Sequence, residues 1–318
     1  MATHNYFVIV GSGRSGSNRL LDMFDLSPRT LARNEADQVD GSPFSTLPRG
    51  NLPLPDSDQF VDDWQNAIDS SVLCQSVRDR IAEHPKVYIK EPLRKLIGRQ
   101  FFRRNRVRSA IGSVFSIGGD EWRLPGWYLN KACVDQIVNV YKLNSCASWM
   151  RALFDANVPA KIIHNLREPH QFMASWYHRY FESQESDRVA RENKVILTAA
   201  AQRDSFWADR CGDIASMSTI ESQVMLWTYI NESIHLAGRG KPNYRTVTYQ
   251  QIDDASMQVS KDLYAFVGLE WTEDIGERVA RMDNKLFKKR SELSSDAERE
   301  VDDALAKYLP QSALAQLF

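Results

Sequence analysis

Short apolar runs alternate along this chain with segments of helical periodicity. The run Tyr6 to Val10 is continuous, apolar and followed by glycine, as in a strand buried on both faces of a parallel sheet. After a glycine-rich turn, Leu20, Leu21 and Phe24 recur at helical spacing, and the pattern stops before Pro28. The sequence therefore begins with a strand, a turn and a helix.

The same two patterns recur along the rest of the chain. Further strands are expected at Val87 to Ile89, Lys161 to Leu166 and Tyr244 to Tyr249, and further helices at about His170 to Phe181, Ser222 to Leu236 and Ser294 to Leu309. This alternation predicts an α/β fold with a doubly wound, mainly parallel sheet flanked by helices. A length of 318 residues fits one elaborated domain over residues 1–318.

Residues of about 41–157 interrupt this alternation. The part from Gly41 to Asp58 contains four prolines and few periodic apolar residues, so we expect an excursion or lid there. Arg94 to Arg108 holds seven cations and no acidic residue, and Trp122, Trp127 and Tyr128 follow it. This basic run either contacts an anionic acceptor or forms a solvated helix face. The whole interruption is predicted to be an insertion for acceptor recognition.

Composition limits the classes of function. With 43% hydrophobic and 25% charged residues, the chain is typical of a globular protein with a sizeable core. A formal net charge of -1 argues against binding of the whole protein to nucleic acid or a membrane surface, so anion binding requires local arginine and lysine clusters.

Cysteines and apolar stretches indicate a cytoplasmic location. The four cysteines lie far apart without metal-ligand spacing, and we expect reduced thiols and no metal site. The first apolar run starts too early for a signal peptide to precede it, and no stretch approaches membrane-spanning length.

A phosphate-binding loop is predicted between the first strand and the first helix. It reads Gly11-Ser12-Gly13-Arg14-Ser15-Gly16-Ser17-Asn18. In such a loop, backbone N–H groups and a helix N-terminus form a cradle for an anion. The lysine of a nucleoside triphosphate-binding loop is missing at Ser17, and the cation lies earlier, at Arg14. The alternative is a glycine-rich turn that binds nothing, or a different nucleotide site.

A second candidate anion site follows the strand that ends at Leu166. Arg167, Glu168 and Pro169 come directly after it, and Ser175 lies eight residues beyond Arg167 in the next helix. An arginine offers a fork of donors to a phosphate, and a serine adds a hydroxyl. The alternative is a helix-capping turn with a surface serine.

Together these motifs resemble those of the sulfotransferase family. The family's loop for the 5′-phosphosulfate is Pro-Arg/Lys-Ser-Gly-Thr-Thr, from which this chain departs at Gly13 and Asn18. Its 3′-phosphate motif, Arg-Asp-Pro with a later serine, is similar to Arg167 to Ser175. Thr248-Tyr249 and Phe266 to Leu269 are similar to a later block, although Gln250-Gln251 replaces its acidic pair. The resemblance covers three separated blocks and less than half of the chain.

This resemblance implies a P-loop-like fold and the donor 3′-phosphoadenosine 5′-phosphosulfate, with 3′,5′-adenosine bisphosphate as the product and no metal. The donor would be held by Gly11, Gly13, Arg14, Ser15, Gly16, Ser17, Asn18, Arg167 and Ser175. The sulfuryl group would pass to a hydroxyl, or less readily an amine, of a small-molecule or glycan acceptor such as a sugar, lipid or phenol.

Candidate catalytic residues also come from the resemblance. Arg14 would stabilise charge on the transferred group. Glu35 would be the general base, since tyrosylprotein sulfotransferases have a glutamate at a similar place. Glu91 is the second choice, with Lys90 beside it, because this pair is similar to the Lys-Glu pair of heparan-type sulfotransferases. The alternatives are a solvated carboxylate at Glu35 and an ion-paired one at Glu91, while the weaker candidate bases are His164, His170 and His178.

Two other classes of function remain open from the sequence. One is a P-loop kinase that uses ATP, which the missing lysine disfavours. The other is a non-catalytic nucleotide-binding protein, which the departures at Asn18 and Gln250-Gln251 would favour.

Overall fold

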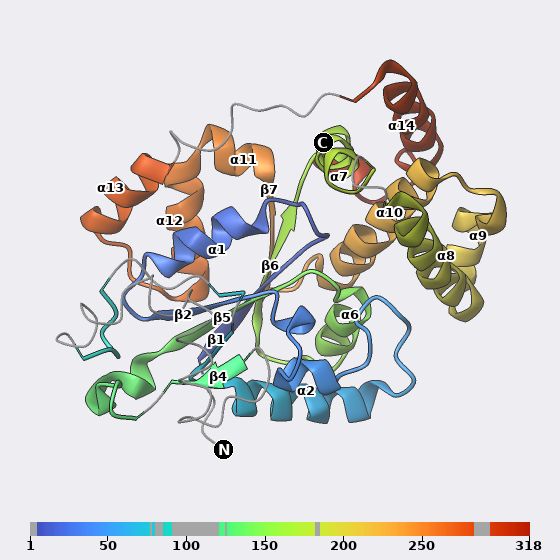
Figure 1. Cartoon of the computed structure of the whole chain (residues 1–318). Coiled ribbons are helices and arrows are strands. Elements are labelled where there is room, and N and C mark those ends of the chain that lie inside the picture. The colour runs from blue at the N-terminus through green and yellow to red at the C-terminus, as the bar shows by residue number, and fades with distance from the viewer. Residues whose placement is uncertain are drawn as a thin grey trace.

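A parallel β-sheet forms the centre of the molecule. The computed structural model describes residues 5–76, 78–79, 85–90, 121–124, 126–181, 185–282 and 293–318. Within these ranges the sheet has five strands in the order β2-β5-β1-β6-β7 (Figure 1). They are β1 (Tyr6–Val10), β2 (Thr30–Asn34), β5 (Val138–Leu143), β6 (Lys161–Leu166) and β7 (Tyr244–Thr248), and each neighbouring pair is parallel. The predicted α/β class with a mainly parallel sheet is confirmed.

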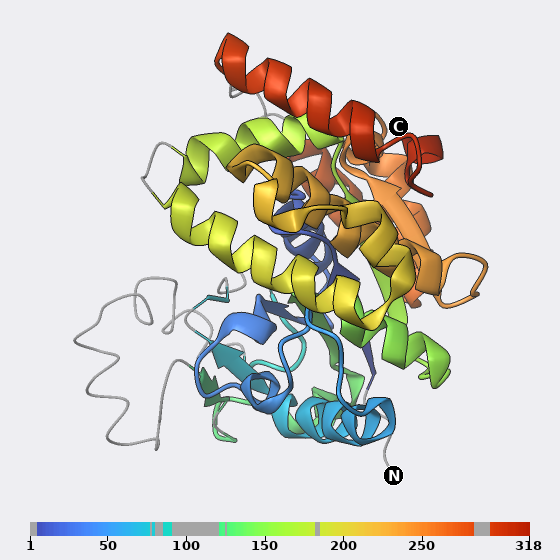
Figure 2. The same ribbon diagram turned by 90° about the vertical axis from the view of Figure 1, so that its right-hand side faces the viewer.

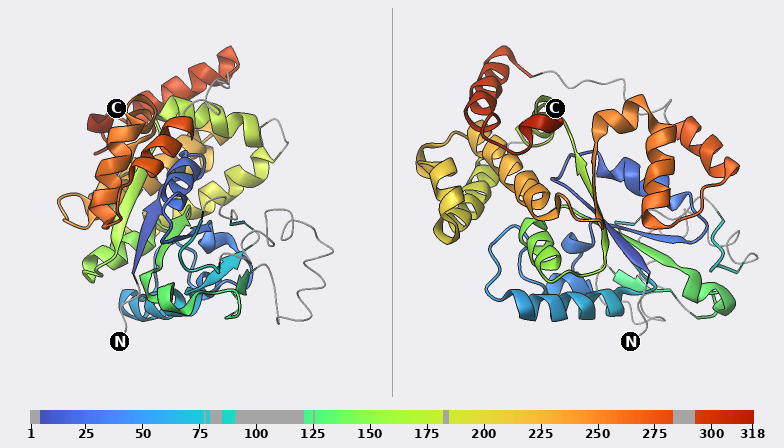
Figure 3. Two further views of the ribbon diagram at one scale, coloured as in Figure 1. Left: turned by 90° about the vertical axis from the view of Figure 1, so that its left-hand side faces the viewer. Right: turned by 180° about the vertical axis from the view of Figure 1, so that it is seen from behind.

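Helices cover both faces of this sheet. Side chains of a strand alternate between its two faces, so Phe7 and Ile9 of β1 join one core while Val8 and Val10 join the other. The first core includes residues of α1, α12 and α13, and the second includes residues of α2, α6 and α10 (Figures 1 and 3). Helices α7, α8, α9 and α14 group around α10 on that second side (Figure 2).

The helices have these bounds: α1 (Ser17–Asp25), α2 (Ser57–Ser71), α6 (Ala147–Asp155), α7 (Pro169–Tyr180), α8 (Ser186–Arg203), α9 (Ser205–Cys211), α10 (Thr219–Gly238), α11 (Tyr249–Asp254), α12 (Ser256–Val267), α13 (Glu273–Met282) and α14 (Ser295–Tyr308). Short 3-10 helices are η1 (Ala36–Gln38), η2 (Pro43–Thr46), η3 (Lys131–Gln136), η4 (Ile214–Ser216) and η5 (Ala315–Leu317). In the described part of the chain, no helix has both the length and the apolar character that crossing a membrane requires.

Most predicted elements agree with the structure. The strands at residues 6–10, 161–166 and 244–249 are β1, β6 and β7, and the helices at 170–181, 222–236 and 294–309 correspond to α7, α10 and α14. Local capping explains two of these boundaries. The Glu168 carboxylate accepts from the backbone N–H groups of His170 and Gln171 at the start of α7, and Ser294 caps α14 by accepting from Ala297 N.

The strand predicted at Val87 to Ile89 is wrong. Residues 87 and 88 lie in a turn, and Ile89 forms only an isolated antiparallel bridge with Leu129. Val87 N donates to Pro28 O, and Tyr88 is buried. The run is apolar because it packs against the start of β2, not because it belongs to a sheet.

The proline-rich segment is part of the core, contrary to the expected excursion or lid. Phe44, Leu47 and Leu54 are buried in the same core as α6. Asn51 Oδ1 accepts from the backbone N–H of Ala147 at 3.3 Å and so caps the N-terminus of α6. Helix α2 follows this segment and runs beside the start of β1 (Figures 1 and 3).

The predicted insertion of about 41–157 also contains elements of the central unit. Its last part holds β5, which lies between β1 and β2, and α6, which packs on α10. A two-stranded antiparallel sheet of β3 (Cys74–Ser76) and β4 (Glu121–Arg123) lies beside β2. The basic run Arg94 to Arg108 is outside the described residues.

Candidate functional site

The predicted phosphate loop joins β1 to α1 in an unusual backbone conformation. Arg14 and Gly16 both have positive φ angles, 70° and 88°. A Cβ atom on Gly16 would lie 2.4 Å from the ring of Tyr249, so glycine is required there both by space and by conformation. Gly16 caps α1 without a side-chain hydrogen bond, and the first turn of α1 has no acidic residue. This helix end therefore presents backbone N–H groups suited to an anion.

The end of β6 holds the loop in place. Asn165 Nδ2 donates to Ser15 O at 2.9 Å, and Arg167 Nη1 donates to Arg14 O at 3.3 Å. A Cβ atom on Gly11 would be 2.5 Å from Asn165 O, so only glycine lets the loop pass this close to β6. In contrast, a Cβ atom on Gly13 would meet nothing within 4 Å.

The two predicted anion motifs meet in the folded chain. Arg14 donates through Nε and Nη2 to Ser175 Oγ, at 3.1 and 3.0 Å. The guanidinium of Arg167 lies 5.0 Å from the centre of the Tyr249 ring, which also covers Gly16. We call Arg14, Arg167, Ser175 and Tyr249 the arginine cluster. The first three members belong to the two predicted anion motifs, and Tyr249 to the later block that is similar to the family.

The arginine cluster holds two guanidinium groups, and the one carboxylate that acts on Arg167 among the described residues is that of Glu168. Within the described residues, neither Arg14 nor Arg167 forms an ion pair with an acidic side chain. Burial lowers the pKa of Arg167 and the charge of Arg14 lowers it further, whereas Tyr249 and the carboxylate of Glu168 act in the opposite direction. Two neighbouring guanidinium groups favour an anion between or beside them.

Unpartnered polar atoms around the loop fit a phosphorylated ligand. Among the described residues, the hydroxyls of Ser12 and Ser15 and the Nε of Arg167 are buried without a hydrogen-bond partner. All three groups can donate, and buried donors are normally paired. Phosphate oxygens, which only accept, are the complementary partners. The residues present thus fit the phosphate groups of the donor that the motifs implied.

Glu35 lies in a separate charged cluster at the end of β2. It has a positive φ of 53°, and its Oε1 accepts from Lys142 Nζ and Asn144 Nδ2, both at 3.0 Å. Its Oε2 accepts from Arg78 Nη1 at 2.6 Å. Burial alone would raise the pKa of Glu35, but the charge and hydrogen bond of Lys142, with Arg78 and Asn144, lower it. Glu35 is therefore an ionised, oriented carboxylate rather than a solvated one.

The three partners of Glu35 were not predicted from the sequence. Lys142 is the most informative, because it is 2% exposed on β5, a strand that was not predicted. Burial lowers the pKa of Lys142, and the Glu35 carboxylate opposes this effect. An interrupted apolar run, Val138 to Leu143 with Asn139 and Lys142, was the available signal.

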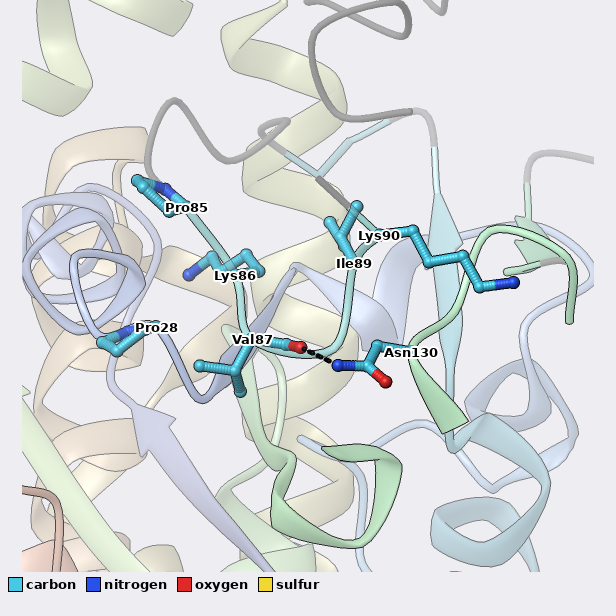
Figure 4. A pocket seen from close by; sticks show the side chains of 7 residues that line it. All are labelled: Pro28, Pro85, Lys86, Val87, Ile89, Lys90 and Asn130. Carbon is cyan, nitrogen blue, oxygen red and sulfur yellow. Dashed lines mark hydrogen bonds between the residues drawn. The ribbon is translucent and has the colours of Figure 1, made fainter. Parts of the chain in front are cut away.

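The structure does not bring Lys90 to the phosphate loop. Lys90 Nζ donates to Trp127 O at 3.0 Å, and Lys90 N donates to Tyr128 O. Lys90 lines a pocket of about 510 Å³ beside Pro28, which precedes β2, whereas Glu35 follows β2 (Figure 4). Glu91 lies outside the described residues. His164 is buried and bonded to Tyr244 and Asn231, and burial lowers its pKa to about 3, so it stays neutral.

Several solved structures are similar to this chain over most of its length. Sulfotransferase STF9 from Mycobacterium avium is 13% identical, with a TM-score of 0.44, over 98% of this chain and 78% of that one. Mouse sulfotransferase SULT7A1, solved with PAP, is 10% identical, with a TM-score of 0.42, over 99% and 88%. A sulfotransferase from Alicyclobacillus acidocaldarius is 13% identical, with a TM-score of 0.37, over 96% and 97%.

All three are sulfotransferases. The sequence matches no protein-family model and no curated protein. The function is therefore inferred from the site and not from these likenesses.

Proposed function

We propose that this chain is a sulfotransferase that moves a sulfuryl group from 3′-phosphoadenosine 5′-phosphosulfate to an acceptor hydroxyl or amine. The observation that carries the proposal is the contact of Arg14 with Ser175 at 3.0 and 3.1 Å, which joins the phosphate loop to a second anion motif. A ligand with phosphates at both its 5′ and 3′ positions needs two such sites side by side. A nucleoside triphosphate needs only the first, with a lysine where this chain has Ser17.

Each part of the site has a role in holding the donor. The N–H groups at the start of α1, with Ser15 and Arg14, would bind the 5′-phosphosulfate. Arg167 and Ser175 would bind the 3′-phosphate, for which the unpartnered Nε of Arg167 is available. The bound donor supplies an activated sulfuryl group.

Arg14 would act by charge and not by proton transfer. During transfer, a bond forms between sulfur and the acceptor oxygen, and the bond from sulfur to the 5′-phosphate oxygen breaks. Negative charge grows on that phosphate as it leaves. A guanidinium stays protonated and stabilises this charge through its N–H groups.

Glu35 would accept the proton that the acceptor hydroxyl loses. Strand β5 lies between β1 and β2, so the ends of those two strands are about 10 Å apart, which leaves room for an acceptor between the phosphate loop and Glu35. Among the described residues, Oε2 accepts only from Arg78, and a carboxylate oxygen has room for a second donor. Its lowered pKa keeps Glu35 ionised but makes it a weaker base than an ordinary glutamate.

Ligand-dependent stability tests the donor assignment. We expect 3′,5′-adenosine bisphosphate to raise the melting temperature, because a ligand that binds only the native state stabilises it by about 2.7 kcal/mol at 100 times its Kd. Arg167→Ala should reduce this stabilisation far more than that given by 5′-AMP. The control is Arg151→Ala on the exposed side of α6, 66% exposed, which should change neither. Stabilisation by ATP but not by the bisphosphate would exclude a sulfotransferase.

Turnover tests the role of Glu35. An acceptor is first found by screening glycans, lipids and phenols with labelled donor. Glu35→Gln should then lower kcat by about 10²- to 10⁴-fold, the usual contribution of a general base, without weakening binding of the bisphosphate. Glu221→Gln is the matched control, because Glu221 is also ion-paired with a lysine, Lys307, but lies on α10. Full turnover by Glu35→Gln would show that another group is the base.

A further inference from the structure

A buried ion cluster lies directly behind Glu35. Its centre is Arg33 of β2, whose side chain is fully buried. Arg33 Nε contacts Asp79 Oδ2 at 3.1 Å, and Nη2 contacts Glu121 Oε2 at 2.6 Å. Nη1 also donates to Ser71 O at 3.3 Å. Tyr141 on the neighbouring strand β5 and Cys74 of β3 are further ionisable groups near Arg33.

Asp79 connects this cluster to the turn that follows β3. Its Oδ1 accepts from Asn34 N, and its Oδ2 accepts from Ser76 N, both at 2.6 Å. One carboxylate thus joins the end of β2 to the end of β3. Its geometry is set by Arg33, which bonds the same carboxylate from the buried side.

The residue beside Asp79 is the one that reaches Glu35. Arg78 O accepts from Asn34 Nδ2 at 3.1 Å, so its main chain is also tied to β2. The Arg78 side chain is 42% exposed and ends 2.6 Å from Glu35 Oε2. An exposed arginine has many rotamers, so this contact depends on where the turn holds its backbone.

We propose that Arg33 is a positioning residue for Glu35: through Asp79, it holds the turn from which Arg78 reaches the Glu35 carboxylate. This inference rests on the proposed role of Glu35 as the acceptor base. The charged groups that face Glu35 are Lys142 from β5 and Arg78 from the turn, and Asp37 of η1 faces Lys142. Of these groups, Arg78 is the one whose backbone position depends on Arg33.

A purely structural role would not require this arrangement. Burying one arginine with two carboxylates costs solvation free energy, and well-packed apolar side chains commonly replace such groups without loss of stability. The cluster does what apolar residues cannot, because Asp79 accepts hydrogen bonds from two strand ends while it pairs with Arg33. Its geometry specifies where the turn lies.

The pKa of Glu35, measured in the whole protein without donor or acceptor, tests this inference. Glutamate labelled with ¹³C at the side-chain carboxyl is followed by NMR as pH is lowered, and the Glu35 signal is the one lost in Glu35→Gln. Arg33→Met and Arg78→Met should each raise the Glu35 pKa towards that of an ordinary glutamate. The double variant should raise it no further than Arg78→Met alone, since coupled residues are not additive.

Two outcomes would overturn the proposal. One is an unchanged Glu35 pKa in Arg33→Met, and the other is a double-variant shift equal to the sum of the two single shifts. The Glu221 signal is the internal reference, because Lys307 and Tyr308 hold its pKa low at a distant place, and it should not move.

A second pair of variants decides the matter if Arg33→Met does not fold. Burial raises the pKa of Asp79 to about 6, so the variant has to remove this side chain whatever its protonation state. Asp79→Ala removes the link to the turn and should raise the Glu35 pKa, whereas Glu121→Gln keeps the Arg33 to Asp79 contact and should leave it unchanged. Equal effects of these two substitutions would contradict the proposed path. Because no turnover is measured, failure here is distinct from failure of the sulfotransferase assignment.

Discussion

Gly16 has a backbone conformation and a close neighbour that together exclude a larger side chain. Its φ is 88°, and a Cβ atom there would lie 2.4 Å from the Tyr249 ring. We expect Gly16→Ala to lower the free energy of unfolding by about 2–4 kcal/mol, because a strained conformation and overpacking act together. Urea unfolding followed by circular dichroism measures this change.

Gly13→Ala is the matched control in the same loop. Gly13 lacks a positive φ, and a Cβ atom there would meet nothing within 4 Å. Its replacement should change the free energy of unfolding by less than about 1 kcal/mol. If both alanine variants were equally stable, the close packing of Tyr249 on Gly16 would be disproved.

Individual site residues differ in how well the sequence predicts them. Arg14, Arg167 and Ser175 were predictable because each sits at fixed spacing in a motif, and the structure brings all three together. Lys142 and Arg78 were not, since their role comes from contacts with Glu35 between segments that are far apart in the chain. No local pattern records such a contact.

At the scale of elements, strands with a continuous apolar run were predicted, and a strand whose run is interrupted by polar residues was missed. β1 and β6 are almost continuous apolar runs, so burial on both faces is visible in the sequence. β5 is equally buried, but its polar residues Asn139 and Lys142 break the run. The false strand at Val87 to Ile89 shows the converse, because a buried turn is also apolar.

The proline-rich segment shows how tertiary contacts override local composition. Prolines and sparse apolar residues suggested an excursion, yet Asn51 caps α6 and Phe44 packs on Trp64 of α2. The segment takes its shape from these contacts and not from a periodic pattern. Periodic apolar patterns come from the regular backbone of helices and strands, so they do not predict the structure of an irregular segment.

At the scale of the whole molecule, the site depends on where the parallel strands end. Loops after β1, β2, β5, β6 and β7 begin at the same edge of the sheet, where ligands of open α/β sheets bind. They supply Arg14, Glu35, Asn144, Arg167 and Tyr249, respectively. With a net charge of -1, the proposed anion binding would depend on this local gathering of arginines and not on the overall field of the molecule.

Hydrogen exchange across the whole chain tests this arrangement. Bound 3′,5′-adenosine bisphosphate should slow amide exchange in three separated segments, the phosphate loop at 11–18, the start of α7 and the start of α11, because one ligand would stabilise all three against local opening. Residues 85–90, which include five that line the pocket beside Pro28 (Figure 4), should exchange as in the free protein. Mass spectrometry of peptic fragments, with and without the bisphosphate, measures both. Slower exchange at 85–90 with an unchanged phosphate loop would place the nucleotide at the opposite edge of the sheet, beside Lys90.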